Sequence, residues 1–206
     1  MKTREELKSL AKQQIKGNIG MLFLISLIIS VITSAASAII PAAGAIVAVI
    51  VTPAFTISLL RVYLNLAKGK VPEVKDTFAG FDDFWTGFKT SFLVGLFTFL
   101  WSLLLYVPGI IKAISYSQAM LIVAENPKIS AREAINRSKE MMEGHKMDYF
   151  VLSLSFIGWI LLGCITLGIA FIWITPYMQA TLINFYNDLK PVAEPVVETI
   201  AEEIAE

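Results

Sequence analysis

Three long stretches of this chain contain no charged residue: Gly17 to Leu60, Thr90 to Ile111 and Tyr149 to Asn187. Charged residues make up only 17% of the chain, whereas soluble domains carry about a quarter. A helix that crosses a bilayer needs about 20 mostly apolar residues, so the stretches have room for two, one and two spans. The apolar residues 113–124 complete a sixth span.

Helices are the expected form of all six spans. The chain shows no alternating strand pattern, and lipid cannot satisfy the backbone groups of an open structure. We therefore predict an all-α, polytopic membrane protein built as a six-transmembrane-helix bundle. The predicted spans are approximately 18–40, 43–66, 90–107, 109–125, 148–163 and 166–187.

The positions of lysine and arginine predict how the chain is threaded. Basic residues are frequent before the first span, between the second and third spans, and between the fourth and fifth. The alternate connections lack them, apart from Lys112 just beyond residues 106–110. Because basic residues favour the cytoplasmic side, both termini are predicted to be cytoplasmic. Residues 36–38 also have the form of a signal-peptide cleavage site, but acidic residues in the preceding segment argue against one.

An amphipathic segment precedes each predicted hairpin of spans. Residues 7–15 repeat apolar side chains at helical spacing, residues 76–88 mix aromatic and acidic side chains, and residues 130–144 begin with the capping-box pattern of Ser130 and Glu133. These segments lie either in the headgroup region with the apolar side down, or against the ends of the bundle. Both interpretations make them helical. The predicted architecture is therefore three transmembrane hairpins, each preceded by an interfacial helix.

Composition and motifs argue against several classes of function. The formal net charge is zero, so there is no electrostatic reason to expect a nucleic-acid partner. The single cysteine, Cys164, excludes an internal disulfide, and with the distant His145 it offers no metal site. No nucleophile elbow, phosphate loop or intramembrane carboxylate pair is found. We therefore predict a protein that is not an enzyme and uses no metal or other cofactor.

Lys112 is the one basic residue near the predicted outer face. It follows Pro108 and Gly109, the predicted outside turn between spans three and four, by about 6 Å of helical rise. In this threading every Asp and Glu lies on the cytoplasmic side, so no acid of the chain reaches Lys112. Lys112 therefore either snorkels to the headgroups or binds a lipid phosphate, a ligand or a partner. With Ser115 and Tyr116 on the same helix face, it forms the candidate ligand-binding site.

Two prolines lie near the middle of predicted spans. Pro53 and Pro176 each follow a threonine and are expected to kink their helices. A kink of this kind either fixes the shape of the bundle or acts as a hinge.

Residues 106–117, 131–162 and 166–189 carry a resemblance to known proteins. Their most specific parts are the segment from Ser138 to Lys146 and the phrases LSFIGW and WITPY. In these stretches the sequence resembles the bacterial integral membrane proteins of the family called domain of unknown function 975. The resemblance covers about residues 8–189 and implies a six-span protein of the bacterial plasma membrane without an established activity. It also implies a distant likeness to the membrane domain that precedes some glycerophosphodiester phosphodiesterases.

The sequence thus divides into a membrane domain, residues 1–190, and an acidic tail, residues 191–206. The tail is either disordered or folds on a cytoplasmic partner. The first functional hypothesis is a protein that binds or translocates a lipid or small amphiphile, with anionic headgroups of the outer leaflet at Lys112. The alternative is an accessory subunit that holds a partner protein in the membrane or at the cytoplasmic face. A third option is the membrane part of a phosphodiester-processing system whose catalytic part is a separate chain.

Overall fold

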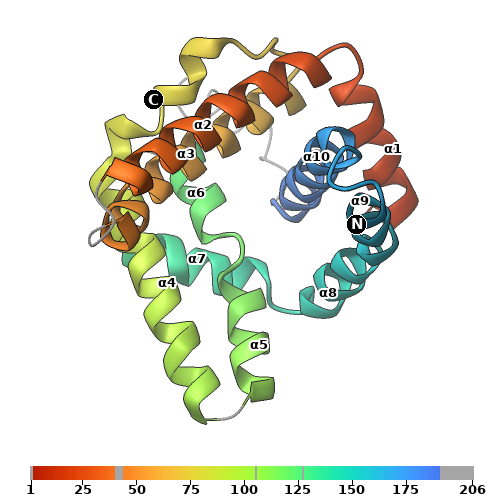
Figure 1. Ribbon diagram of the computed structural model, residues 1–206. Helices are drawn as coiled ribbons and strands as arrows, with labels where there is room; N and C mark the ends of the chain where they lie inside the picture. Colours follow the sequence, from red (N-terminus) through yellow and green to blue (C-terminus); the bar gives the residue numbers. More distant parts are fainter. Residues whose placement is uncertain (1, 40–43, 105, 127, 191–206) are drawn as a thin grey trace, which may run out of the picture.

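The computed structural model describes residues 2–39, 44–104, 106–126 and 128–190 (Figure 1). Every regular element in this described part is helical, which confirms the all-α prediction. The elements are α1 (Arg4–Ile15), α2 (Ile19–Ile39), α3 (Gly44–Ala67), η1 (Val74–Phe78), η2 (Phe81–Asp83), α4 (Phe84–Leu104), α5 (Tyr106–Tyr116), α6 (Ala119–Glu125), α7 (Ala131–Met141), α8 (Lys146–Leu154), α9 (Ile157–Ile165) and α10 (Phe171–Leu189).

Three stretches of helix within the described residues are long and apolar enough to cross a membrane. They are Val49–Ala67 in α3, Val107–Glu125 across α5 and α6, and Lys146–Ile165 across α8 and α9. A fourth results if α1 and the residues Ile19–Ala35 of α2 count as one broken span, although these two helices are bent by 86°. The described part of the chain therefore has three to four candidate membrane-spanning helices.

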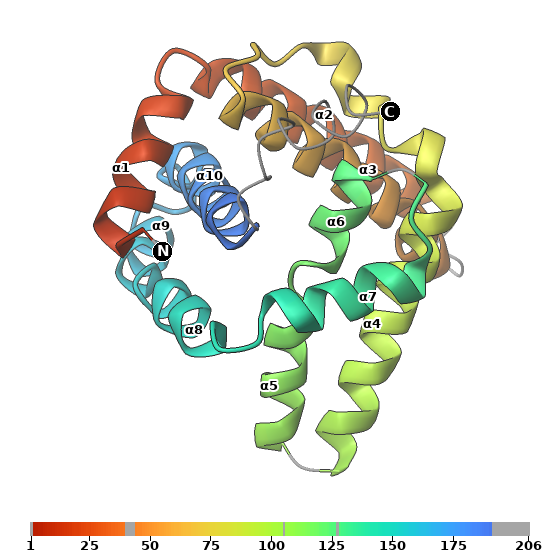
Figure 2. The same ribbon diagram turned by 180° about the vertical axis from the view of Figure 1, so that it is seen from behind.

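The helices gather around α10, while α4 and α5 form a pair that extends away from the others (Figures 1 and 2). α1 packs along α10, and α3 packs on α2, α6 and α10. The main core lies where these helices meet, and its large buried side chains include Leu7, Leu22, Tyr63, Phe185 and Tyr186. The core therefore joins α1 to the helices of predicted spans one, two and six.

α1 shows how the local sequence determines an element. The backbone N–H of Glu6 donates to Thr3 Oγ1 over 3.3 Å, and the Thr3 N–H donates to Glu6 Oε2 over 2.6 Å. This capping box satisfies two N–H groups that the helix leaves unpaired. The predicted apolar row is confirmed, because Leu7, Ala11 and Ile15 are all buried. Gly17 then takes a positive φ of 85°, which lets the chain turn sharply into α2.

The turn between α4 and α5 differs from the prediction. Pro108 and Gly109 lie within the first turns of α5, which begins at Tyr106. A proline is tolerated there because the first N–H groups of a helix have no intrahelical partner. A Cβ on Gly109 would lie 2.8 Å from the Ser102 Cα. Gly109 therefore lets α5 pack closely on α4 and does not form the turn.

The segment before α4 also differs from the prediction of an amphipathic helix. Residues 74–83 form two short 3-10 turns, and α4 begins at Phe84. The reason is a close approach to α3, because a Cβ on Gly80 would lie 2.1 Å from the carbonyl oxygen of Ala54. The Gly80 N–H donates to Ser58 Oγ over 2.8 Å. These contacts of Gly80 with the backbone and side chains of α3 are incompatible with a regular amphipathic helix at this position.

Predicted spans four and five are interrupted. α5 and α6 are separated at Ser117 and Gln118, and α8 and α9 are separated at residues 155–156. At the first break, the Gln118 N–H donates to Ser138 Oγ over 3.2 Å, and Ser138 Oγ donates to the Ser115 carbonyl over 2.8 Å. A side chain of α7 thus satisfies backbone groups released by the break, as buried polar groups require.

Both predicted kink residues lie inside helices, Pro53 in α3 and Pro176 in α10. Each lacks the N–H that would continue the helical hydrogen bonding. Near Pro53, the Thr56 hydroxyl donates to the Thr52 carbonyl over 2.9 Å. Whether either proline acts as a hinge stays a prediction.

Candidate functional site

The structure places the three predicted ligand-binding residues in different surroundings. Lys112 is half-buried in α5, and its Nζ lies 4.7 Å from the centroid of the Trp101 ring in α4. Ser115 Oγ donates to the Ile111 carbonyl of its own helix over 2.8 Å. Tyr116 is buried against Phe97. These side chains do not converge on one point, so an anion site at Lys112 stays a prediction.

Lys112 has no carboxylate within ion-pair distance among the described residues. Its ammonium is attracted to the face of Trp101, an interaction of about 0.5–1 kcal/mol at an exposed site. The Trp101 ring therefore gives Lys112 a partner that does not depend on any acid of the chain.

A row of three cations lies on α1. Arg4, Lys8 and Lys12 are spaced by four residues, which places them on one side of the helix. The Lys8 Nζ lies 4.8 Å from the centroid of the Phe156 ring, and the Lys12 Nζ lies 5.7 Å from that of Tyr177. The row therefore faces the chain between α8 and α9 and the first half of α10.

Two adjoining hollows lie between this row and α8. The first, of about 610 Å³, is lined by residues that include Arg4, His145, Leu152 and Phe185. The second, of about 500 Å³, is lined by Thr3, Arg4, Glu5, Lys8 and Ser155. We call the two hollows together the basic groove.

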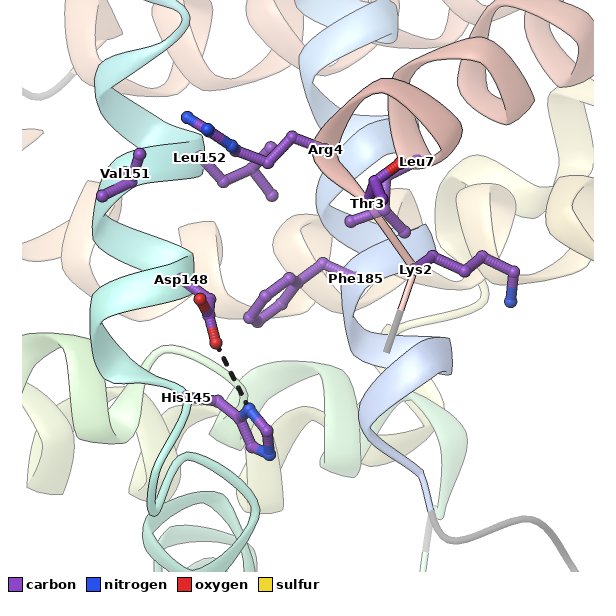
Figure 3. Close-up of a pocket in the computed structure, with 9 residues that line it drawn as sticks. All are labelled: Lys2, Thr3, Arg4, Leu7, His145, Asp148, Val151, Leu152 and Phe185. Atoms are coloured by element: carbon purple, nitrogen blue, oxygen red, sulfur yellow. Dashed lines mark hydrogen bonds and ion pairs between the residues drawn. The ribbon is translucent and has the colours of Figure 1, made fainter.

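The close-up view shows how the groove is built (Figure 3). The Arg4 side chain extends from α1 toward Leu152 of α8, and the Phe185 ring of α10 lies between the two helices. At the start of α8, His145 Nδ1 lies 3.4 Å from Asp148 Oδ2. The groove therefore combines cations on one wall with apolar side chains beneath them, a combination suited to an amphiphile with an anionic head.

Two acids, Glu5 and Asp148, also line the groove, but neither forms an ion pair with Arg4 or Lys8. Among the described residues, neither Arg4 nor Lys8 nor Lys12 has a carboxylate within 4.0 Å. Partial burial lowers the pKa of the Lys8 ammonium, and the neighbouring charges of Arg4 and Lys12 lower it further. An anion bound in the groove would relieve this mutual repulsion.

Arg61, in contrast, is paired. Arg61 forms an ion pair with Asp83 and donates to the carbonyls of Ala79 and Ala124. This arginine thereby ties α3 to the 3-10 turns and to α6. A buried cation is normally compensated in this way.

A second paired cluster lies where α6 meets the end of α10. Glu125 accepts hydrogen bonds from the Tyr186 hydroxyl over 2.7 Å and from Lys190 Nζ over 2.5 Å. Lys68 Nζ lies 3.9 Å from the same carboxylate. Among the described residues, no group of three or more His, Cys, Asp or Glu side chains is placed to hold a metal ion.

The described fold is that of a helical protein with candidate membrane spans, and the basic groove lies between its α1 and α8. The family model described as "Protein of unknown function (DUF975)" matches residues 1–115 and 103–193, so the chain belongs to that family. The resemblance expected from the sequence is thereby confirmed. No curated protein and no solved structure matches the chain.

The basic groove was missed by the sequence interpretation, which used Arg4, Lys8 and Lys12 only to predict orientation. Their four-residue spacing beside the apolar row of Leu7 and Ala11 was a usable signal of one continuous basic face. The opposite wall could not be inferred, because α8 lies far along the chain from α1.

Proposed function

We propose that this protein is an integral membrane protein of the bacterial plasma membrane that binds or translocates an anionic lipid or a similar amphiphile through the basic groove. The observation that carries the proposal is the row of Arg4, Lys8 and Lys12, which have no carboxylate partner among the described residues and lie above apolar side chains. A lipid phosphate supplies the missing negative charge. The acyl chains of the same lipid pack against the apolar side chains that line the groove.

The proposal includes six spans with both termini in the cytoplasm. It is supported by large apolar side chains exposed on helices outside the three unbroken candidate spans, such as Leu27 and Val31 on α2 and Phe92 and Phe99 on α4. In water they would form an extensive apolar surface, whereas lipid accommodates them. In this threading the basic groove lies at the cytoplasmic headgroups, because α1 precedes the first span.

We further propose a role in binding or translocation without catalysis. The titratable pair in the groove is His145 with Asp148, at the exposed beginning of α8. A single His–Asp pair at the start of a helix is better suited to contact a lipid headgroup than to act as a general acid and base. The groove residues thus agree with a role in recognising charge.

The proposed function can be tested by titrating the detergent-solubilised protein with phosphatidylglycerol or phosphatidylcholine and counting bound lipids by native mass spectrometry. The double variant Lys8→Gln/Lys12→Gln removes two cations of the α1 row: Lys8 lines the groove, and Lys12 lies one helical turn beyond it. Each basic residue near a membrane surface contributes about 1 kcal/mol to the attraction of anionic lipid. The apparent Kd for phosphatidylglycerol is therefore expected to rise at least about tenfold.

The matched control is Lys70→Gln/Lys128→Gln, which removes the same charge from two exposed positions outside the groove. Its affinity should stay within about twofold of the wild type. An equal loss of affinity for phosphatidylglycerol in both double variants would show that nonspecific electrostatics attract the lipid. It would contradict binding in the groove. If neither variant changes lipid binding and one defined protein co-purifies with the wild type, the accessory-subunit alternative replaces this proposal.

A further inference from the structure

The basic groove carries acids as well as cations. Asp148 lines its larger hollow, and Glu5 lines the smaller one. Among the described residues, neither carboxylate lies within 4.0 Å of a lysine or arginine nitrogen. Lys2, a further cation of the larger hollow, is already paired with Asp188. The groove therefore presents two unpaired cations of the α1 row and two carboxylates that no lysine or arginine of the described chain compensates.

The two signs of charge are held apart by the helices that carry them. Arg4 and Lys8 are one turn apart on α1, so their side chains lie on the same side of that helix. Asp148 comes from α8, and the Arg4 side chain extends toward Leu152, one turn farther along α8 (Figure 3). A ligand that spans about one helical turn, about 5.4 Å of rise, can therefore reach both the cations and the carboxylate.

His145 contacts the Asp148 carboxylate without using up its capacity for hydrogen bonds. Its Nδ1 lies 3.4 Å from Asp148 Oδ2. A carboxylate has two oxygens and about four lone-pair sites, so this contact leaves room for a further donor. The Asp148 side chain is 57% exposed, so a ligand in the hollow can reach it.

A lipid headgroup that carries both signs of charge matches this arrangement. Arginine and lysine bind phosphate, and a carboxylate accepts hydrogen bonds from a primary ammonium, which has three N–H donors. Val151, Leu152 and Phe185 line the same hollow and offer an apolar surface to acyl chains. Phosphatidylethanolamine has this chemistry, because a two-carbon bridge joins its phosphate to a primary amine. Phosphatidylglycerol has no amine, and the ammonium of phosphatidylcholine is fully methylated and has no N–H to donate.

We propose that the basic groove recognises a headgroup with a phosphate and a primary amine, the phosphate bound by Arg4 and Lys8 and the ammonium by Asp148. The lipid form of this ligand rests on the proposed function of the groove. The pairing of amine and carboxylate does not, because it can be measured with the headgroup alone.

Native mass spectrometry of the detergent-solubilised full chain tests the amine contact. The protein is titrated with phosphatidylethanolamine and with phosphatidylcholine of identical acyl chains. A largely exposed ion pair contributes at most about fivefold in affinity. Phosphatidylethanolamine is therefore expected to bind about three- to fivefold more tightly than phosphatidylcholine. A preference below about twofold would overturn the proposal.

The variant Asp148→Asn keeps the shape of the side chain and removes its charge. It should lose the preference for phosphatidylethanolamine, while its affinity for phosphatidylglycerol should rise, because a carboxylate that repels the lipid phosphate is gone. Asp82→Asn makes the same change at an exposed position of η2 outside the groove and should keep the preference. If the preference survives in Asp148→Asn, or is lost in Glu5→Gln instead, the assignment of the amine to Asp148 is wrong.

Two further comparisons separate this inference from the proposed function. If phosphatidylglycerol binds more tightly than phosphatidylcholine but phosphatidylethanolamine does not, the amine contact is wrong while the proposed function stands. If soluble phosphoethanolamine binds as tightly as phosphatidylethanolamine and Asp148→Asn weakens it, the headgroup contact stands and the proposed lipid function fails.

Discussion

Asn184 in α10 and Gln14 in α1 exchange two hydrogen bonds: Asn184 Nδ2 donates to Gln14 Oε1, and Gln14 Nε2 donates to Asn184 Oδ1, each over 3.0 Å. Asn184 Nδ2 also donates to the Leu7 carbonyl over 3.3 Å. Asn184 is buried, so its amide depends on these partners. The pair therefore fixes the position of α1 against α10, and with it one wall of the basic groove.

Asn184→Ala is expected to lower the free energy of unfolding by about 1–3 kcal/mol, because Gln14 loses its partner in a partly buried site. The measurement is a thermal melt in detergent, read by circular dichroism. Asn136→Ala, at an exposed position of α7, is the matched control and should change stability by less than about 0.5 kcal/mol. Equal effects of the two substitutions would show that the α1–α10 amide pair is not a stabilising link.

Gly80 should tolerate no side chain. An alanine there would place its Cβ against the carbonyl oxygen of Ala54 in α3. We expect Gly80→Ala to cost at least about 1–3 kcal/mol of stability or to prevent folding. Gly95→Ala in the middle of α4 meets no atom within 4 Å, so it should be neutral or stabilise by up to about 1 kcal/mol.

Much of the fold could be predicted from local patterns. The capping box of Thr3, the apolar row of α1 and the N-cap of α7 at Ser130 depend on neighbours within a few residues. Close contacts between distant segments could not be predicted. The two 3-10 turns and the first turns of α5 depend on how Gly80 and Gly109 approach other helices. Hydrophobic patterning carries no information about such approaches.

The same limit applies to the candidate site. Lys112 could be recognised from the sequence as a lysine without an acidic partner, because its position in a charge-poor stretch is a local property. The basic groove needs α1 and α8 to line the same hollow, which is a property of the packed structure. Its cations were visible in the sequence, but they looked like ordinary cytoplasmic charges.

If Lys112 holds a lipid phosphate at the outer leaflet, as the predicted threading places it, Lys112→Ala should reduce the amount of phosphatidylglycerol that co-purifies with the protein. Lys112→Arg should retain the lipid, since it keeps both the charge and the stacking on Trp101. Native mass spectrometry after extraction from the membrane gives the comparison. Identical lipid content in all three proteins would mean that Lys112 only snorkels.

The ion pair of Lys2 with Asp188 predicts a dependence of stability on pH. Partial burial raises the pKa of Asp188, but hydrogen bonds from the Lys2 backbone and ammonium outweigh this effect and hold the pKa below its ordinary value. Such a pair stabilises the fold above the unfolded pKa of about 3.9, and this stabilisation is lost as pH falls through the lower folded pKa.

The difference in melting temperature between wild type and Asp188→Asn should therefore be largest near pH 6. With about 1 kcal/mol for a partly exposed pair, the difference is about 2–4 °C. It should shrink as the pH is lowered toward 3. A difference that stays constant from pH 6 to pH 3 would contradict a stabilising role for the ionised carboxylate.

The threading can be tested by cysteine labelling in intact cells, after removal of the native thiol by Cys164→Ser. Ile169→Cys lies in the exposed connection between α9 and α10, which is predicted to face outside. Lys128→Cys lies before α7, on the predicted cytoplasmic side, and leaves the Ser130 cap intact. A membrane-impermeant maleimide should label position 169 in intact cells and position 128 only after permeabilisation, because basic connections stay inside. Labelling of position 128 from outside would overturn the six-span arrangement, and the basic groove would then lie on the wrong side for cytoplasmic lipid.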